Sequence, residues 1–162
     1  MTEIDRLIAN AESHAESFRG GLPAPPARKL AVLTCMDARI DVHALLGLEE
    51  GEAHVLRNSG GVATEDARRS LAISQNMLGT EEIVLIHHTD CGIHNFSDRE
   101  IADRIEERTG VRPSWESLAF DDLEQDVRDS MEAIRNDPLI PSTDRVRGFV
   151  FDVRTGDLRE VR

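Results

Sequence analysis

Short hydrophobic runs alternate with longer amphipathic stretches along the chain. Three of the runs are apolar enough to be buried strands, and they cover residues 29–34, 54–56 and 82–88. The last of them, EIVLIHH, is rich in β-branched residues, which favour strands. Strands separated by helical stretches predict an α/β fold with a mainly parallel β-sheet flanked by helices.

The amphipathic stretches carry their own start and stop signals. Thr64 can cap a helix over 65–78, and Ser97 can cap another over 98–109, each followed by a glycine. A further helix is expected over about 118–136 because apolar residues recur there at helical spacing. Its apolar stripe contains Phe120, Leu123, Val127, Met131 and Ile134.

The C-terminal region has the pattern of a hairpin. Residues 148–153 and 158–161 are strand-like, and they flank the turn-forming sequence Arg154-Thr155-Gly156-Asp157. We therefore predict a C-terminal hairpin. Because we find no internal repeat, low-complexity tract or domain boundary, we expect a single domain over 1–162.

The N-terminal region predicts a helical arm over 1–28. Residues 3–18 have helix-like spacing, and the proline-rich segment 22–26 is a stiff, extended connector. This helix is therefore expected to stand off the main body. The sequence allows it to pack on a neighbouring subunit or on its own domain.

Composition and charge limit the classes of partner that we expect this protein to bind. The chain has 162 residues, 40% of them hydrophobic, and a formal net charge of -12. Nucleic acids and anionic membranes need basic patches, so neither is an expected partner. No run approaches the ~18 apolar residues of a membrane span. Residues 1–18 also lack the features of a secretory signal, and we expect a cytoplasmic protein.

Metal-ligating residues follow two of the predicted strands. Cys35 comes directly after the first strand, and His88 and Cys91 lie at the end of the third. If these strands are parallel neighbours, the three side chains meet at one edge of the sheet. Two thiolates and an imidazole suit zinc. Because only three ligands are evident, the fourth position is expected to be open to water, as in catalytic zinc sites.

A second signal lies beside Cys35. In an extended chain, side chains at i, i+2 and i+4 share a face, so Asp37 and Arg39 can point the same way as Cys35. A carboxylate beside a zinc ion can accept a hydrogen bond from the hydroxide formed there. A paired arginine would keep this carboxylate ionised and oriented. The alternative is an ordinary surface ion pair, which the nearby Cys35 makes the weaker interpretation.

Three motifs in this order resemble those of the β-class carbonic anhydrases. They are C-M-D-A-R at 35–39, R-N-S-G-G at 57–61 and H-T-D-C-G at 88–92. The likeness runs from about residue 30 to residue 92, and the short chain is most similar to the compact prokaryotic branch of the family.

The resemblance has specific implications. It implies one Zn²⁺ per chain, held by Cys35, His88 and Cys91, and a catalytic dyad of Asp37 and Arg39. It also implies a homodimer or a tetramer of dimers, with the N-terminal helix on the partner subunit and the active site near the dimer interface. The expected activity is the reversible hydration of carbon dioxide to bicarbonate and a proton.

Some members of this family have an inhibitory bicarbonate pocket. That pocket uses a tryptophan three residues before the first zinc-ligating cysteine, together with a tyrosine. Here that position is Val32, and the chain contains no tyrosine. We therefore expect no such pocket and an open fourth zinc position near neutral pH.

Three alternative functions remain open from the sequence. The first is a hydrolase of carbonyl sulfide or carbon disulfide on the same scaffold, which the family signature does not exclude. A zinc-binding regulatory module would need a fourth protein ligand or a missing dyad, and neither is visible. A dithiol redox protein would pair Cys35 with Cys91, but the chain has no C-x-x-C motif.

Other polar and aromatic residues have weaker signals. His87 alternates with His88 on a strand and is expected to face away from the site in a structural role. His94 is either a proton shuttle or simply exposed, and Asp90 either orients a neighbour or belongs to a turn. Trp115 is expected to anchor packing. The acidic stretch 121–126 is expected to be a solvated helix face.

Overall fold

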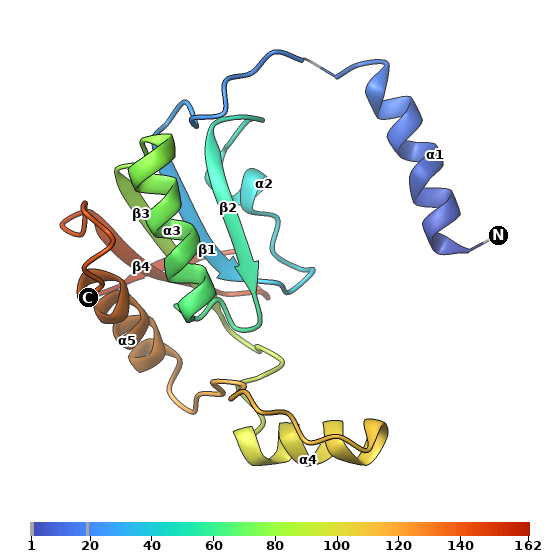
Figure 1. Ribbon diagram of the computed structural model, residues 1–162, viewed down its shortest axis with the longest axis vertical. Coiled ribbons are helices and arrows are strands. Elements are labelled where there is room, and N and C mark those ends of the chain that lie inside the picture. Colours follow the sequence, from blue (N-terminus) through green and yellow to red (C-terminus); the bar gives the residue numbers. More distant parts are fainter. Residues whose placement is uncertain (1, 19) are drawn as a thin grey trace.

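A five-stranded sheet forms the centre of the computed structural model, which describes residues 2–18 and 20–162 (Figure 1). The strand order is β2-β1-β3-β4-β5. All neighbouring pairs are parallel except β4 and β5, which are antiparallel. The strands are β1 (Leu30–Cys35), β2 (Ala53–Asn58), β3 (Glu82–His88), β4 (Val146–Phe151) and β5 (Leu158–Val161). This architecture confirms the α/β prediction and the C-terminal hairpin.

The central strands β1 and β3 are parallel neighbours. Their register runs from Leu30 opposite Glu82 to Thr34 opposite Ile86. Both strands therefore end at the same edge of the sheet, with Cys35 at one end and His88 at the other. The predicted metal site required these two strands to be parallel neighbours, and they are.

Two helices cover one face of the sheet (Figure 1). α3 (Glu65–Leu78) contacts β1 and β2, and α5 (Leu123–Arg135) contacts β3, β4 and β5. Thr64 caps α3 by accepting a hydrogen bond from the amide of Ala67, and Gly79 ends it with a left-handed φ of 74°. The core between these helices and the sheet includes Leu33, Leu71, Leu85, Val127 and Ile134, all fully buried.

A second core lies on the opposite face of the sheet and extends to the carboxyl ends of the strands. It contains Cys35 and Cys91 together with the buried side chains of Val62, Ile86 and Phe120. The short helix α2 (Val42–Leu46), which the sequence analysis did not predict, contributes Val42 to this core.

Two helices protrude from the body (Figure 1). α4 (Asp98–Thr109) is capped by Ser97 and followed by Gly110, as predicted, and it has no buried residue. α1 (Glu3–Ala15) also has no buried residue and stands apart from the sheet, as expected of an arm, although it ends three residues before Phe18. Within residues 2–18 and 20–162, no helix is both long and apolar enough to cross a membrane.

The helix expected over 118–136 begins later than its apolar stripe suggested. Leu118 has a left-handed φ of 56°, which a helix does not allow. Asp122 is extended and caps α5 by accepting hydrogen bonds from the amides of Glu124 and Gln125. Phe120 is buried, but it lies in the segment before the helix and packs near Cys35 and Cys91.

Candidate metal centre and active site

The structure brings Cys35, His88 and Cys91 together at the carboxyl edge of the sheet. All three are buried, and one ligand atom from each lies within 4.8 Å of the others. Cys35 ends β1, His88 ends β3, and Cys91 follows in the turn after β3. Residues 56 positions apart thus meet because β1 and β3 are parallel neighbours.

The spacing of the two sulfur atoms fits a shared metal ion. The Sγ atoms of Cys35 and Cys91 lie 3.9 Å apart, and both cysteines are free. A disulfide would need about 2.0 Å. Two thiolates at tetrahedral positions around zinc, each with a bond of about 2.3 Å, lie about 3.8 Å apart. The observed distance matches the metal geometry and not the disulfide.

The imidazole of His88 is oriented as a ligand. Its Nδ1 lies 2.9 Å from the carbonyl of Thr89, which can only accept, so Nδ1 carries the ring proton. Thr89 is itself fixed to β4 through its amide, which donates to the carbonyl of Phe151 at 3.0 Å. The other nitrogen, Nε2, is buried and has no hydrogen-bond partner among the described residues. A buried lone pair facing two thiols is what a metal ion requires.

The two thiols influence each other strongly. A hydrogen bond with the Cys91 thiol, assisted by His88, lowers the pKa of the Cys35 thiol to about 4 although burial opposes this. The hydrogen bond with Cys35 and burial raise the pKa of the Cys91 thiol above its usual range. One sulfur is therefore ready to ionise while the other retains its proton, which a bound dication would displace.

Charge around the cluster also affects His88. Burial is the largest effect on its imidazole and disfavours protonation, but the adjacent Cys35 side chain and the negative charges of Cys35 and Asp37 outweigh it and raise the pKa. Negative potential of this kind favours a cation at the same place.

Asp37 and Arg39 form a bidentate pair beside the cluster. Arg39 donates from Nε to Oδ1 at 2.9 Å and from Nη2 to Oδ2 at 2.7 Å. These hydrogen bonds hold the pKa of the Asp37 carboxyl well below its usual range. Asp37 Oδ2 lies 3.8 Å from Nε2 of His88, so the ionised carboxylate adjoins the candidate ligands.

The pairing of Asp37 with Arg39 was predicted, but its structural cause is different. β1 ends at Cys35, and residues 37–40 form a turn in which the amide of Ile40 donates to the carbonyl of Asp37. The amide of Arg39 also donates to Asp37 Oδ1 at 2.9 Å. A turn closed by the aspartate, and not an extended chain, places the two side chains together.

Two further residues support the turn that carries Asp37 and Arg39, and the sequence analysis had not assigned a role in the site to the first of them, Arg57. Arg57 donates from Nε to the carbonyl of Cys35 at 3.0 Å and from Nη2 to that of Asp37 at 2.6 Å. Asp90 accepts from Arg39 Nη1 at 2.8 Å, and with a left-handed φ of 54° it also lies in the turn after β3, so it has both of the roles that the sequence had left open. The R-N-S-G-G motif was the available signal for Arg57.

Gly60 and Gly61 allow the loop after β2 to approach the site closely. Both have a left-handed φ, 83° and 76°. A Cβ atom on Gly61 would lie 2.9 Å from the Cys35 amide nitrogen, and one on Gly60 would lie 2.4 Å from Ile93 Cδ1. Glycine at these two positions therefore permits a close approach of the loop to Cys35 and Ile93.

Three other expectations have mixed outcomes. His87 faces away from the cluster, as predicted, and is fully buried. The expectation that Trp115 anchors packing is wrong within this chain, because Trp115 is 60% exposed. The stretch 121–126 is not wholly solvated, because the Asp126 side chain is only 16% exposed and faces His87.

His94 is partly buried near Phe120. Its Nδ1 lies 3.0 Å from the Phe120 carbonyl and therefore carries the ring proton. Its ring is tilted against that of Phe120, with centroids 5.5 Å apart. The proton-shuttle role of His94 stays a hypothesis.

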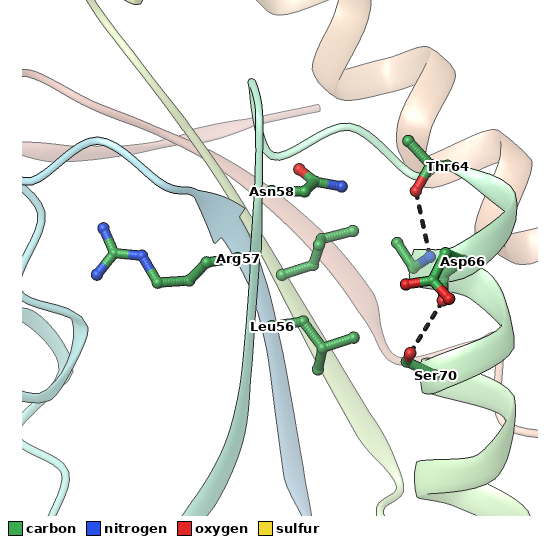
Figure 2. Close-up of a pocket in the computed structure, with 8 residues that line it drawn as sticks. Leu56, Arg57, Asn58, Thr64, Asp66 and Ser70 are labelled. Carbon is green, nitrogen blue, oxygen red and sulfur yellow. Dashed lines mark hydrogen bonds between the residues drawn. The ribbon is translucent and has the colours of Figure 1, made fainter. Parts of the chain in front are cut away.

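A separate polar pocket lies between the end of β2 and the start of α3 (Figure 2). Asn58 points into this pocket from β2, whereas Arg57 points to the opposite side of the strand. The direction of Arg57 agrees with its hydrogen bonds to Cys35 and Asp37. Because none of the three clustered residues lines this pocket, we do not place the chemistry there.

Comparison with known proteins identifies the family. Residues 30–158 match the sequence model of the family described as Carbonic anhydrase. β-Carbonic anhydrase 1 of Mycobacterium tuberculosis is 50% identical over 161 residues, which are 99% of each chain. The chain belongs to the β-carbonic anhydrase family. It is thus related to lyases, and the motifs that suggested the resemblance lie within the matched region.

Two further relatives of this β-carbonic anhydrase family member extend the comparison. The crystal structure of a carbonic anhydrase from Streptococcus mutans superposes with a TM-score of 0.94 at 40% identity, covering 100% of this chain and 99% of that one. A carbon disulfide hydrolase of an Acidianus species is 32% identical over 182 residues, covering 97% of this chain and 88% of the relative. The family scaffold therefore includes proteins named for two different substrates.

Proposed function

We propose that this protein catalyses the reversible hydration of carbon dioxide with one zinc ion held by Cys35, His88 and Cys91. The observation that carries the proposal is the buried Cys-His-Cys cluster with the ionised Asp37 carboxylate beside it. Full-length similarity to a β-carbonic anhydrase supports it. Zinc bound there would supply the Lewis acidity that turns water into a nucleophile near neutral pH.

Asp37 is suited to orient the attacking water. Its Oδ1 accepts two hydrogen bonds from Arg39, whereas Oδ2 accepts one. The less occupied oxygen, Oδ2, is also the one that faces His88. Asp37 therefore keeps an accepting lone pair directed toward the cluster, and it stays ionised because Arg39 pairs with it.

The surroundings of the cluster suit a small apolar substrate. Val62, Ile86 and Phe120 belong to the buried cluster that includes both cysteines. These side chains exclude water and strengthen the local electrostatic interactions. Carbon dioxide needs no charged partner to enter such a site, while the product bicarbonate is charged and returns to solvent with the released proton.

A second copy of the chain is proposed to cover α1. Ile4, Leu7 and Ile8 lie on the apolar side of this helix and are 67%, 56% and 56% exposed. Burying three such side chains would contribute about 1.5–3 kcal/mol each. This supports a homodimer in which α1 packs on the partner subunit.

The decisive experiment compares the wild type with Asp37→Asn. We expect about one zinc per chain in both proteins, because Asp37 is not a proposed ligand. Stopped-flow hydration of carbon dioxide should fall at least about 100-fold in the variant, which has lost the oriented carboxylate. Asp144→Asn, at an 81% exposed side chain, is the matched control and should keep wild-type rates.

Substrate preference is tested in the same preparation. The relative named carbon disulfide hydrolase makes carbon disulfide and carbonyl sulfide the competing substrates, so sulfide release should be measured alongside hydration. We expect rapid hydration and little sulfide. Unchanged hydration in Asp37→Asn would refute the role of the carboxylate, and sulfide release without hydration would replace the proposed substrate.

A further inference from the structure

His87 is a buried histidine that the reaction itself does not use. It immediately precedes His88 on β3 and lies on the opposite side of the strand, with no exposed surface. Its Nε2 is 3.1 Å from the carbonyl oxygen of Gly61. Because a carbonyl can only accept, Nε2 carries a proton and donates it to this bond.

The rest of the His87 ring is enclosed by α5 and by the segment before it. Asp126 Oδ2, on α5, lies 3.1 Å from His87 Nδ1. The two atoms face each other without the alignment of a full hydrogen bond, and both are buried with no other partner in the described chain. The ring of Phe120 stacks on the imidazole, with centroids 5.8 Å apart and planes at 24°. The orientation of the imidazole is therefore fixed.

Gly61, which accepts from His87, supports a candidate metal ligand. A Cβ atom at Gly61 would lie 2.9 Å from the amide nitrogen of Cys35, 3.0 Å from the carbonyl carbon of Thr34 and 3.2 Å from the carbonyl oxygen of Ile86. Gly61 thus lies directly against the ends of β1 and β3. Any displacement of its backbone alters the space behind Cys35.

α5 also holds the other side of this loop. The amide of Ala63 donates to Ser130 Oγ at 3.2 Å, and Ser130 is one turn beyond Asp126 on the same helix. α5 therefore holds the loop after β2 directly through Ser130, and its Asp126 packs against His87, which donates to Gly61 in the same loop.

We propose that His87, enclosed by Asp126 and Phe120, is a positioning residue for the metal centre. Its hydrogen bond to Gly61 keeps the glycine loop pressed against Cys35 and so sets the position of the Cys35 sulfur relative to His88 and Cys91. His88 thus supplies a metal ligand itself, whereas the adjacent His87 supports Cys35, the ligand on β1. This inference rests on the proposed function, because it requires the cluster to hold a metal.

The test uses cobalt(II) as a spectroscopic probe in the full-length protein. His87→Leu removes the donor, whereas His87→Gln retains an amide N–H that can reach Gly61. We expect His87→Leu to lower cobalt affinity, measured by competition with a chelator, about tenfold or more, as loss of a residue that supports a metal ligand does. Its thiolate-to-cobalt absorption bands should shift and kcat should fall. His87→Gln should restore most of each property.

Two further variants separate positioning from simple packing. His54→Leu removes another histidine that hydrogen-bonds inside the protein, to Ser74 Oγ at 2.7 Å, at the opposite end of β2 from Asn58. It should lower the melting temperature and leave the cobalt spectrum unchanged. Asp126→Leu, at a partly exposed position, should shift the cobalt spectrum in the same direction as His87→Leu does. Asp126→Asn should shift the spectrum less.

The outcomes are distinct. The positioning role is refuted if His87→Leu has a lower melting temperature but keeps the wild-type cobalt affinity and spectrum. If His87→Leu does not fold, the same result for Asp126→Leu refutes it. If the wild type itself binds no metal or does not hydrate carbon dioxide, the proposed function fails instead.

Discussion

Arg39 donates two hydrogen bonds to Asp90, from Nη1 to the carboxylate at 2.8 Å and from Nη2 to the backbone carbonyl at 2.8 Å. The same guanidinium holds both oxygens of Asp37. Arg39 is therefore fixed from two sides, and Asp90, next to the candidate ligand Cys91, connects the turn after β3 to the turn after β1. Asp37, Arg39 and Asp90 thus form a triad of two carboxylates and one guanidinium.

The first prediction concerns this triad. Asp90→Asn removes a charge but keeps the backbone contact, and the side chains of Arg39 and Asp90 are 45% and 54% exposed. An exposed ion pair is worth about 0–1 kcal/mol, so kcat/KM for hydration should fall by no more than about fivefold. Arg39→Lys should cost more than about tenfold, because an amine cannot hold both Asp37 oxygens in a bidentate pair. Equal losses of kcat/KM in the two variants, measured by stopped flow, would contradict the prediction that Arg39 contributes more than Asp90.

The second prediction concerns Gly61. Gly61→Ala should destabilise the protein more than Gly79→Ala, although both glycines have a similar left-handed φ, 76° and 74°. The backbone strain of about 1–2 kcal/mol is common to both substitutions. Only the Cβ at Gly61 would meet backbone atoms, at 2.9 Å from Cys35, whereas nothing lies within 4 Å at Gly79.

The measurement is denaturant unfolding of both variants, together with their zinc content. We expect Gly61→Ala to lose zinc affinity as well as stability, and Gly79→Ala to lose stability alone. Equal unfolding free energies for the two variants would show that the contact with Cys35 is not tight.

The third prediction concerns pH and the loop before α5. Hydrogen bonds from the Ser117 hydroxyl and the Ala119 amide hold the pKa of Asp98 below its usual range. A carboxyl with a lowered pKa in the folded protein stabilises it fully above its unfolded pKa of about 3.9. This contribution is lost as the pH falls through the lower, folded value. The loop around Trp115 should therefore loosen only in strong acid.

Trp115, the single tryptophan of the chain, reports this transition by fluorescence. Asp98→Asn cannot titrate at this position, so its emission should lack the acid transition that the wild type shows. Superimposable titration curves for the two proteins would mean that Asp98 does not hold the loop.

Local signals in the sequence were sufficient for most of the fold. Thr64 and Ser97 marked helix starts, and the apolar run over β3 matched the observed strand at both ends. The start of α5 was mistaken because Phe120 fits the helical stripe, while its burial depends on a contact with His87 that no local pattern encodes. The helix α2 has only five residues, too few for periodicity to reveal.

The residues of the candidate site also differ in how visible they are in the sequence. Residues that we propose to carry the chemistry, such as Cys35 and Asp37, lie in recognisable motifs. Residues that support them through backbone contacts are less visible, because Arg57 acts on carbonyl groups and Asp126 acts through His87. An acidic residue in an acidic stretch looks solvated until the helix is placed against its neighbour.

The most direct test of the account is X-ray absorption at the zinc edge of the purified wild-type protein. We predict about one zinc per chain, with two sulfur neighbours at about 2.3 Å and nitrogen or oxygen neighbours at about 2.0–2.1 Å. His88→Asn should lose one nitrogen neighbour and bind zinc more weakly, whereas His43→Asn, at an exposed position on α2, should match the wild type. A protein that contains no zinc, or whose zinc has no sulfur neighbours, would contradict the account.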